Sequence, residues 1–215
     1  MNDFNVFIEA WKIRASRLLD SGLEYLQQLE YIPAPDGVFG NFLDQLIELP
    51  FTEKHVTGIV ALINKQSPYL QECGIKLAIA FLRDVGEDPA LGVAIGKLLG
   101  THTLDPWVLQ AIVEFAQSSS ESIDDPDNIL LFKGLAQAVY EREYKQTEPF
   151  SGNIMRSCPI LHIAIADARK LLEQVVLTNT HPARTKAVLP YLEQRYNTKG
   201  LEDTVNTIRS KLFGI

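Results

Sequence analysis

Cysteine is scarce in this sequence, and its placement excludes two classes of protein. Of the 215 residues only two are cysteines, Cys73 and Cys158, and they lie far apart in the chain. A disulfide framework or a zinc site needs more cysteines, clustered with one another or with histidines. We therefore expect two reduced, buried thiols, since a free cysteine usually behaves as a small apolar side chain.

Long apolar runs are also missing. The longest strongly apolar stretch, LAIAFL at 77–82, is far shorter than the roughly 20 residues that cross a bilayer. The N-terminal MNDFNVFIEAWK carries Asp3 before its first basic residue, Lys12, which is atypical of a secretory signal. These absences predict a cytoplasmic protein that does not associate with a membrane.

Positive charge is in deficit, and unevenly so. The net charge is −7, but residues 1–130 hold 19 acidic and 8 basic side chains, whereas residues 131–215 hold 8 acidic and 12 basic ones. Nonspecific DNA binding needs clustered positive charge, so nucleic acid is an unfavoured partner. The basic end is either a solvated face, which we favour, or an anion-binding surface for an acidic partner. Its basic residues include Arg156, Arg169, Lys170, Arg184, Lys186, Arg195, Lys199, Arg209 and Lys211.

Histidine pairs of the kind that bind metals are absent as well. The four histidines are scattered, and none belongs to an HxH or HxxxH motif, nor do the cysteines form a CxxC motif. We therefore predict no metal site, no cofactor and no catalytic residues. The histidines are His55, His102, His162 and His181.

The stretch SCPILHIAIADARK at 157–170 is the candidate for thiol chemistry. Cys158 precedes a proline near an expected helix N-terminus, where backbone amides activate thiols, and His162 follows one helical turn later. Asp167 is five residues from His162 and therefore lies off its face. Because the segment is apolar nearly all round, we favour a buried central helix, with His162 in the core, over a nucleophilic pair.

Helical periodicity is what the sequence has in abundance. Apolar residues recur at the spacing of one helix face from Leu104 to Phe115 and again from Leu201 to Leu212. Period-two alternation is hard to find, so we predict an all-α protein. Six prolines precede helical patterns, as prolines in the first turn of a helix do, and most follow a short polar residue. They are Pro68, Pro89, Pro106, Pro126, Pro159 and Pro182, with expected N-caps at Ser67, Asp88, Asp105 and Asp125.

The spacing of these prolines indicates a repeat of helix pairs. The first and third are 38 residues apart and the second and fourth 37, close to the roughly 40-residue period of helix-pair repeats. On these caps and apolar spacings, residues 52–146 resemble HEAT-like or armadillo-like repeats, with a looser third pair at 153–198. The fixed Arg and Asp ladder of sharper HEAT units is absent. The resemblance implies stacked antiparallel helix pairs in an α-solenoid, and an irregular helical bundle is the alternative.

A single all-α domain over residues 1–215 is the expected organisation. Residues 1–50 would form a long helix and a capping helix, residues 52–146 two helix-pair repeats, and residues 153–215 the looser third pair and a C-terminal helix. Pro190 lies inside the second helix of that last pair and is expected to kink it or split it.

The N-terminal segment carries an unusually bulky apolar stripe. A helix over residues 4–31 would be about 40 Å long, and Gly22 either breaks it or lets a neighbour approach closely. The stripe either caps the first layer of the array, which we favour, or docks a partner or a second copy in a homodimer. Its bulky members are Phe4, Phe7, Ile8, Trp11, Leu18 and Leu19.

These observations predict a non-enzymatic protein–protein interaction module, such as an adaptor, assembly chaperone, immunity protein or regulatory scaffold. The resemblance implies binding of other macromolecules along one face of the array, and no catalytic residues carry over from it. The alternative is a HEAT-like enzyme or ligand-binding protein, such as a DNA-repair glycosylase or a chromophore lyase. A glycosylase would want a positively charged groove, and the net charge of −7 counts against one.

Overall fold

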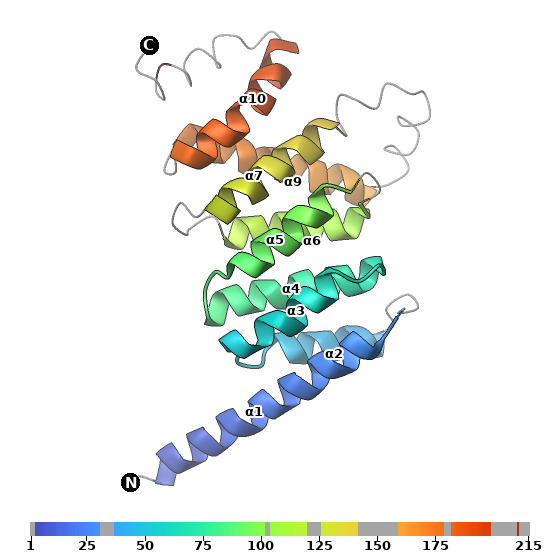
Figure 1. Ribbon diagram of the computed structural model, residues 1–215, viewed down its shortest axis with the longest axis vertical. Coiled ribbons are helices and arrows are strands. Elements are labelled where there is room, and N and C mark those ends of the chain that lie inside the picture. Colours follow the sequence, from blue (N-terminus) through green and yellow to red (C-terminus); the bar gives the residue numbers. More distant parts are fainter. Residues whose placement is uncertain are drawn as a thin grey trace. The chain divides into compact units, whose positions relative to one another are not determined.

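The protein is helical throughout the part of the chain that the structure describes (Figure 1). A computed structural model describes residues 3–30, 37–101, 104–119, 126–141, 159–178, 182–198 and 210. Over these ranges it contains nine α-helices, one 3-10 helix and no strand, so the all-α prediction is confirmed. None of the helices found there has both the length and the apolar character needed to span a membrane. The chain divides into two compact units, Met1–Ile95 and Gly96–Ile215.

All six prolines expected to begin helices do so. Proline suits this position because the first turn of a helix leaves its backbone N–H groups unpaired in any case. The helices that start at these prolines are α4 (Pro68–Asp84), α5 (Pro89–Leu99), α6 (Pro106–Ser118), α7 (Pro126–Tyr140), α9 (Pro159–Thr178) and α10 (Pro182–Thr198).

The expected N-caps are confirmed at three of four positions, two of them with a capping hydrogen bond. Asp88 accepts a hydrogen bond from the backbone N–H of Ala90 at 2.8 Å, and Asp105 accepts one from Trp107 at 2.9 Å. Ser67 occupies the N-cap of α4, but its side chain makes no capping hydrogen bond. Asp125 lies outside the described residues. At the other end of the chain α10 runs through Pro190 to Thr198, so the expected split does not occur.

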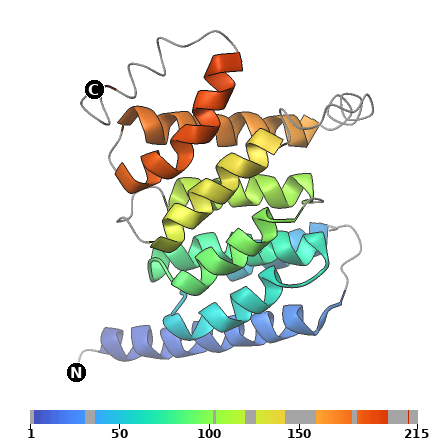
Figure 2. The same cartoon turned by 45° about the horizontal axis from the view of Figure 1, so that its top comes forward.

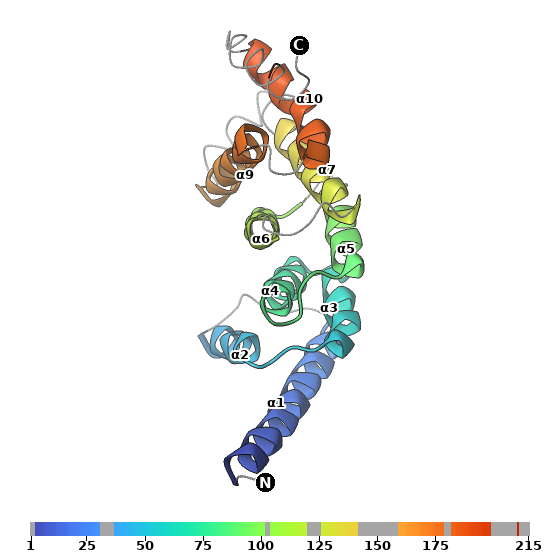
Figure 3. The ribbon, with the colours of Figure 1, turned by 90° about the vertical axis from the view of Figure 1, so that its left-hand side faces the viewer.

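The first unit holds its helices in two layers. Helix α1 (Asp3–Gln28) packs against α3 (Val56–Ile63), and α2 (Gly37–Ile47) packs against α4. Helix α3, which follows the short 3-10 helix η1 (Glu53–His55), packs across the layers against α4. Figure 3 shows α1 and α3 on one side of this unit and α2 and α4 on the other. The fully buried apolar side chains include Leu19, Leu26, Ile59, Leu62, Ile63, Leu70, Ile75 and Leu77.

Two glycines let helices of the first unit approach closely. A Cβ atom on Gly22 of α1 would lie 2.5 Å from Cδ2 of Leu46 in α2. Of the two expectations for Gly22, close approach is therefore confirmed, while a break in the helix is wrong because α1 continues to Gln28. Gly74 of α4 faces α3, where a Cβ atom would lie 2.9 Å from the backbone nitrogen of Ile63.

The second unit also consists of packed helix pairs. Helix α6 packs against α9 and α7 against α10, and α9 also contacts both α7 and α10. Figures 1 and 2 show α7 and α10 crossing over α6 and α9. Among the largest buried side chains are Phe132 of α7 and Arg184 of α10. Packed helix pairs thus occur in both units, which is consistent with a helical-repeat fold.

Candidate interaction surface

Helix α1 carries more apolar residues than its neighbours cover. Its buried residues follow the i, i+4, i+7, i+8 and i+11 spacing of one helix face, and α2 and α3 pack against it. A stripe of apolar residues thereby becomes part of the core of the first unit, which leaves the remaining apolar residues of α1 outside it. The buried face consists of Ala15, Leu19, Gly22, Leu23 and Leu26.

Three bulky side chains of α1 form an exposed ridge beside this buried face. Trp11, Leu18 and Tyr25 are 51%, 56% and 53% exposed, and they follow one another at seven-residue intervals. Seven residues make almost two helical turns, so the three side chains lie along one line of the helix. We call these three residues the α1 ridge. Of the bulky stripe that is expected to cap the first layer, Leu19 is buried, whereas Trp11 and Leu18 are exposed.

Aromatic side chains of α2 widen one end of the α1 ridge. The ring of Tyr25 meets the ring of Phe42 edge-on, with 5.9 Å between their centroids, and Phe42 lies 6.2 Å from Phe39. Phe42 and Phe39 are themselves only partly buried. Edge-to-face packing holds such rings in a defined orientation. The ridge therefore ends in a group of three rings that is partly open to solvent.

The other end of the ridge stands clear of the rest of the first unit. Residues 10–14 are all exposed. Figures 1 and 3 show the first half of α1 extending past α2 and α3. A second helix could therefore lie along Trp11 without displacing α2 or α3.

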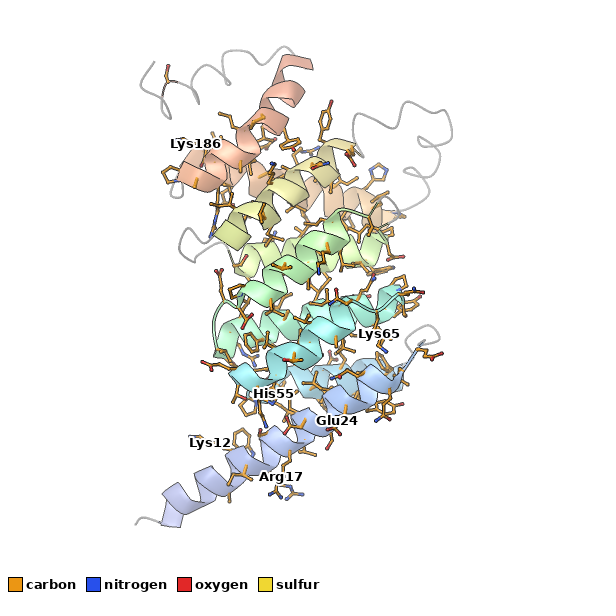
Figure 4. All side chains as sticks on the ribbon, viewed as in Figure 1. Lys12, Arg17, Glu24, His55, Lys65 and Lys186 are labelled. Atoms are coloured by element: carbon orange, nitrogen blue, oxygen red, sulfur yellow. The ribbon has the colours of Figure 1, made fainter. Side chains whose placement is uncertain are left out.

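After the acidic Asp3 and Glu9 near its start, the charges of α1 are grouped by sign. Residues 10–17 contain three basic side chains and no acidic one, whereas residues 20–30 contain three acidic side chains and no basic one. Figure 4 shows Arg17 near the middle of the helix and Glu24 further toward its end. Of these three acidic residues only Glu24 belongs to the exposed part of α1 near the ridge, because Asp20 bonds Lys54 and His55 and Glu30 follows the end of the helix. The basic residues are Lys12, Arg14 and Arg17, and the acidic ones are Asp20, Glu24 and Glu30.

A buried histidine ties α1 to the segment before α3 (Figure 4). His55 Nδ1 accepts a hydrogen bond from the backbone N–H of Thr52 at 2.9 Å, so Nε2 carries the proton and donates to Asp20 Oδ1 at 3.1 Å. Lys54 Nζ donates to the other oxygen of Asp20 at 2.7 Å. Because Asp20 lies on the far side of α1 from the ridge, these bonds help to set which face of α1 is exposed.

Asp20, His55 and Thr52 are the residue types of a catalytic triad, but their geometry does not serve catalysis. Thr52 Oγ1 lies 3.3 Å from His55 Nδ1, yet the backbone N–H of Thr52 already occupies that nitrogen. The His55 side chain is only 1% exposed. A general base needs a free lone pair within reach of the substrate. His55 is therefore a structural residue.

Acid should weaken the first unit through His55. Burial lowers the pKa of His55 below its ordinary value of 6.5, against the opposing effect of Asp20. The unfolded chain therefore binds a proton more readily than the folded one, and stability present above pH 6.5 is lost as the pH falls through the lower folded pKa. We expect the unfolding temperature to fall below neutral pH, and to fall less in His55→Asn, whose Oδ1 can still accept the Thr52 N–H.

Thermal unfolding of both proteins followed by circular dichroism from pH 7.5 to pH 5 checks this expectation. The other three histidines are present in both proteins, so the difference between the two profiles isolates His55. Parallel profiles would contradict the assigned protonation state. The hydrogen bond from Lys54 chiefly holds the pKa of Asp20 below its usual range, so loss of that carboxylate would appear only at still lower pH.

The stretch at 157–170, the candidate for thiol–imidazole chemistry, does not place its histidine in the core as expected. His162 is exposed on α9, and Ile163 beside it is 50% exposed, so the prediction of a core histidine is wrong. Helix α9 buries one face only, and apolar side chains at its start extend beyond that face. Cys158 lies outside the described residues. Cys73 is free and buried, and burial raises its pKa to about 12, as expected of an unreactive thiol.

The basic C-terminal third is not a uniformly solvated face. Arg184 is fully buried, and its guanidinium carbon lies 5.0 Å from the centre of the Phe132 ring, so its prediction as a surface charge is wrong. Lys186, two residues later, is exposed. Lys170 lies 3.6 Å from Asp167, one turn away on the same helix. Side chains outside the described part of the chain are those of Arg156, Arg195, Lys199, Arg209 and Lys211.

Comparisons with known proteins point to no relative, because no protein family, no curated protein and no solved structure matches the chain. Among the side chains that the structure describes, no three of the His, Cys, Asp and Glu type gather as metal ligands would. Two features of the surface escaped sequence reasoning: the aromatic pair of Phe39 and Phe42, and the division of charge along α1. The second has a readable signal, since the sign of charge changes between Glu9 and Lys12 and again between Arg17 and Asp20.

Proposed function

We propose that this chain is a non-enzymatic protein–protein interaction module of HEAT-like helix pairs, with the α1 ridge as its contact surface. The observation that carries the proposal is the row of Trp11, Leu18 and Tyr25, each more than half exposed. Tryptophan and tyrosine supply much of the binding energy at protein interfaces. An aligned row of such side chains is typical of a surface that another protein covers.

The packed helix pairs of both units support a HEAT-like arrangement, in which long helix faces remain available for binding. An adaptor, assembly chaperone, immunity protein or regulatory scaffold in the cytoplasm would use such a surface, and a homodimer through α1 belongs to the same proposal. The enzymatic alternative, a glycosylase or a chromophore lyase, has less support. The histidine that best resembles a catalytic group, His55, is closed to solvent.

A capture experiment with two matched triple variants tests the assignment of the surface. The ridge variant carries serine in place of the three ridge residues. The control variant removes three exposed bulky side chains of the second unit instead, and all its substitutions fall on positions at least 50% exposed. The ridge variant is Trp11→Ser, Leu18→Ser and Tyr25→Ser, and the control variant is Trp107→Ser, Leu130→Ser and Ile163→Ser.

Tagged full-length protein is incubated with a cell extract to which untagged protein of the same sequence is added. The proteins that it retains are identified, and their affinity for the tagged protein is measured by titration. We expect the ridge variant to bind the retained protein at least about 30-fold more weakly than wild type, as loss of an interface hot spot implies. The control variant should bind it as wild type does. Both variants should keep the thermal unfolding profile of wild type, since the replaced side chains are exposed. Equal retention by the two variants would contradict the proposal.

A further inference from the structure

We infer that the α1 ridge is covered by a second copy of the same chain, with the two α1 helices antiparallel and centred on Leu18. This inference rests on the proposed function and names the partner of the same surface. It depends on three observations: the symmetric spacing of the ridge, the aromatic group at its end, and the division of charge along α1.

The ridge is spaced symmetrically about Leu18. Trp11 and Tyr25 lie seven residues to either side of it, which is about 10 Å along the helix axis in each direction. When two such helices lie antiparallel with their Leu18 side chains in contact, Trp11 of each copy comes opposite Tyr25 of the other.

The aromatic group at one end of the ridge provides a place for the tryptophan at the other end. Tyr25 is held edge-on by Phe42 but remains 53% exposed. In the antiparallel pair, Trp11 of the second copy lies against the open side of Tyr25 and Phe42. The first half of α1 extends past α2 and α3 in Figures 1 and 3, so a second helix can lie beside it without displacing these two helices.

The charge division along α1 fixes the direction of the pairing. In the antiparallel order the basic segment 12–17 of each helix runs beside Glu24 of the other, and Arg14 comes within about one helical turn of that Glu24. The same pair recurs by twofold symmetry, so the interface is closed and self-complementary. In parallel order Arg14 would face Arg14 and Glu24 would face Glu24, and like charges would repel.

A partner of a single charge sign fits this surface less well than a second copy does. An acidic segment would be attracted by Arg14 and Arg17 but repelled by Glu24, and a basic segment would meet the reverse. A partner whose charge changes sign along its length complements the ridge better, and the segment of α1 that carries the ridge, residues 11–25, has that pattern.

Sedimentation equilibrium of the full-length chain tests the pairing. We expect a reversible dimer for wild type. Leu18→Arg places two like charges together at the twofold axis and should weaken the dimer about 100-fold or more. Ile163→Arg is the matched control, since Ile163 is 50% exposed on a helix of the second unit, and it should leave the dimer unchanged.

A charge exchange tests the direction. Arg14→Glu alone sets the introduced carboxylate against Glu24 of the second copy at two places, and should weaken the dimer by about fivefold to tenfold. Glu24→Arg alone should do the same, and the double exchange Arg14→Glu with Glu24→Arg should restore wild-type affinity. In a parallel pair the double exchange would not restore the affinity, because residue 14 of one copy would face residue 14 of the other, and residue 24 would face residue 24.

Two outcomes overturn the pairing. One is a wild-type chain that stays monomeric at every concentration, and the other is a dimer that Leu18→Arg leaves intact. If the chain is monomeric, but wild type captures a different protein that the ridge variant does not retain, the self-pairing is wrong and the proposed function stands. If neither self-association nor capture depends on the ridge, both are wrong.

Discussion

Gly74→Ala is expected to destabilise the first unit by about 3 kcal/mol, at the upper end of the range for overpacking a core. Gly74 lies in α4 where that helix crosses α3. An added Cβ atom would lie 2.9 Å from the backbone nitrogen of Ile63 and 3.0 Å from Cβ of Leu62. A backbone nitrogen and a Cβ atom move only with the helix that carries them. The α3–α4 contact, which joins the two layers of this unit, must therefore open to admit one methyl group.

Gly96→Ala is the matched control for this prediction. Gly96 is also a helical glycine, in α5, but a Cβ atom there would have nothing within 4 Å apart from its own helix. The substitution should stabilise the chain by about 0.5–1 kcal/mol, the helix-propensity difference between glycine and alanine. Urea unfolding followed by circular dichroism measures both changes, and hydrogen exchange of α3 and α4 locates the first. If Gly74→Ala had wild-type stability, α3 and α4 would not approach each other as closely at Gly74 as the structure shows.

The helix starts were predictable from the sequence because they depend on local chemistry. A proline at the first turn needs no partner, and an aspartate before it caps the turn within two residues, as Asp88 and Asp105 do. Ser67 shows the limit of this reasoning. It precedes a proline in the same way, but it is buried and makes no capping bond, and burial depends on the surrounding packing.

Which face of α1 is buried was not predictable from spacing alone. The sequence offers a stripe through Trp11, Ala15, Leu18, Gly22 and Tyr25, with alternating steps of three and four residues. The structure buries a face that shares Ala15 and Gly22 with this stripe and leaves its three bulky residues exposed. Small residues lie at the closest helix contact because they permit it. The bulky residues beside them then fall outside the core.

Contacts between residues far apart in sequence were likewise not predictable. Asp20 and His55 are 35 positions apart, and nothing near either one indicates that they meet. His162 appeared to be the histidine of the core because its neighbours are apolar, yet it is exposed. Apolar neighbours in sequence lie all around a helix, whereas burial is decided by the one side that packs.

Arg184→Ala is expected to destabilise the second unit by about 2–4 kcal/mol, the cost of a cavity left by a long buried side chain. Arg184 is fully buried, and its guanidinium lies over the Phe132 ring, 5.0 Å from its centre. The substitution removes both this contact and the packing of the side-chain stem, while α10 keeps a good helix former. Urea unfolding of the full chain, with hydrogen exchange of α7 and α10, measures the loss.

Lys186→Ala is the control for Arg184→Ala. The comparison distinguishes a buried basic residue from an exposed one, which the sequence alone does not do. Both residues are basic and lie two positions apart in α10, but Lys186 is exposed, so its replacement should change stability by less than about 0.5 kcal/mol. Arg184→Met keeps most of the buried volume without the charge. If packing dominates, Arg184→Met should recover most of the stability lost in Arg184→Ala; if the guanidinium over Phe132 dominates, the two variants should be equally unstable. Equal stability of Arg184→Ala and Lys186→Ala would contradict the burial of Arg184 itself.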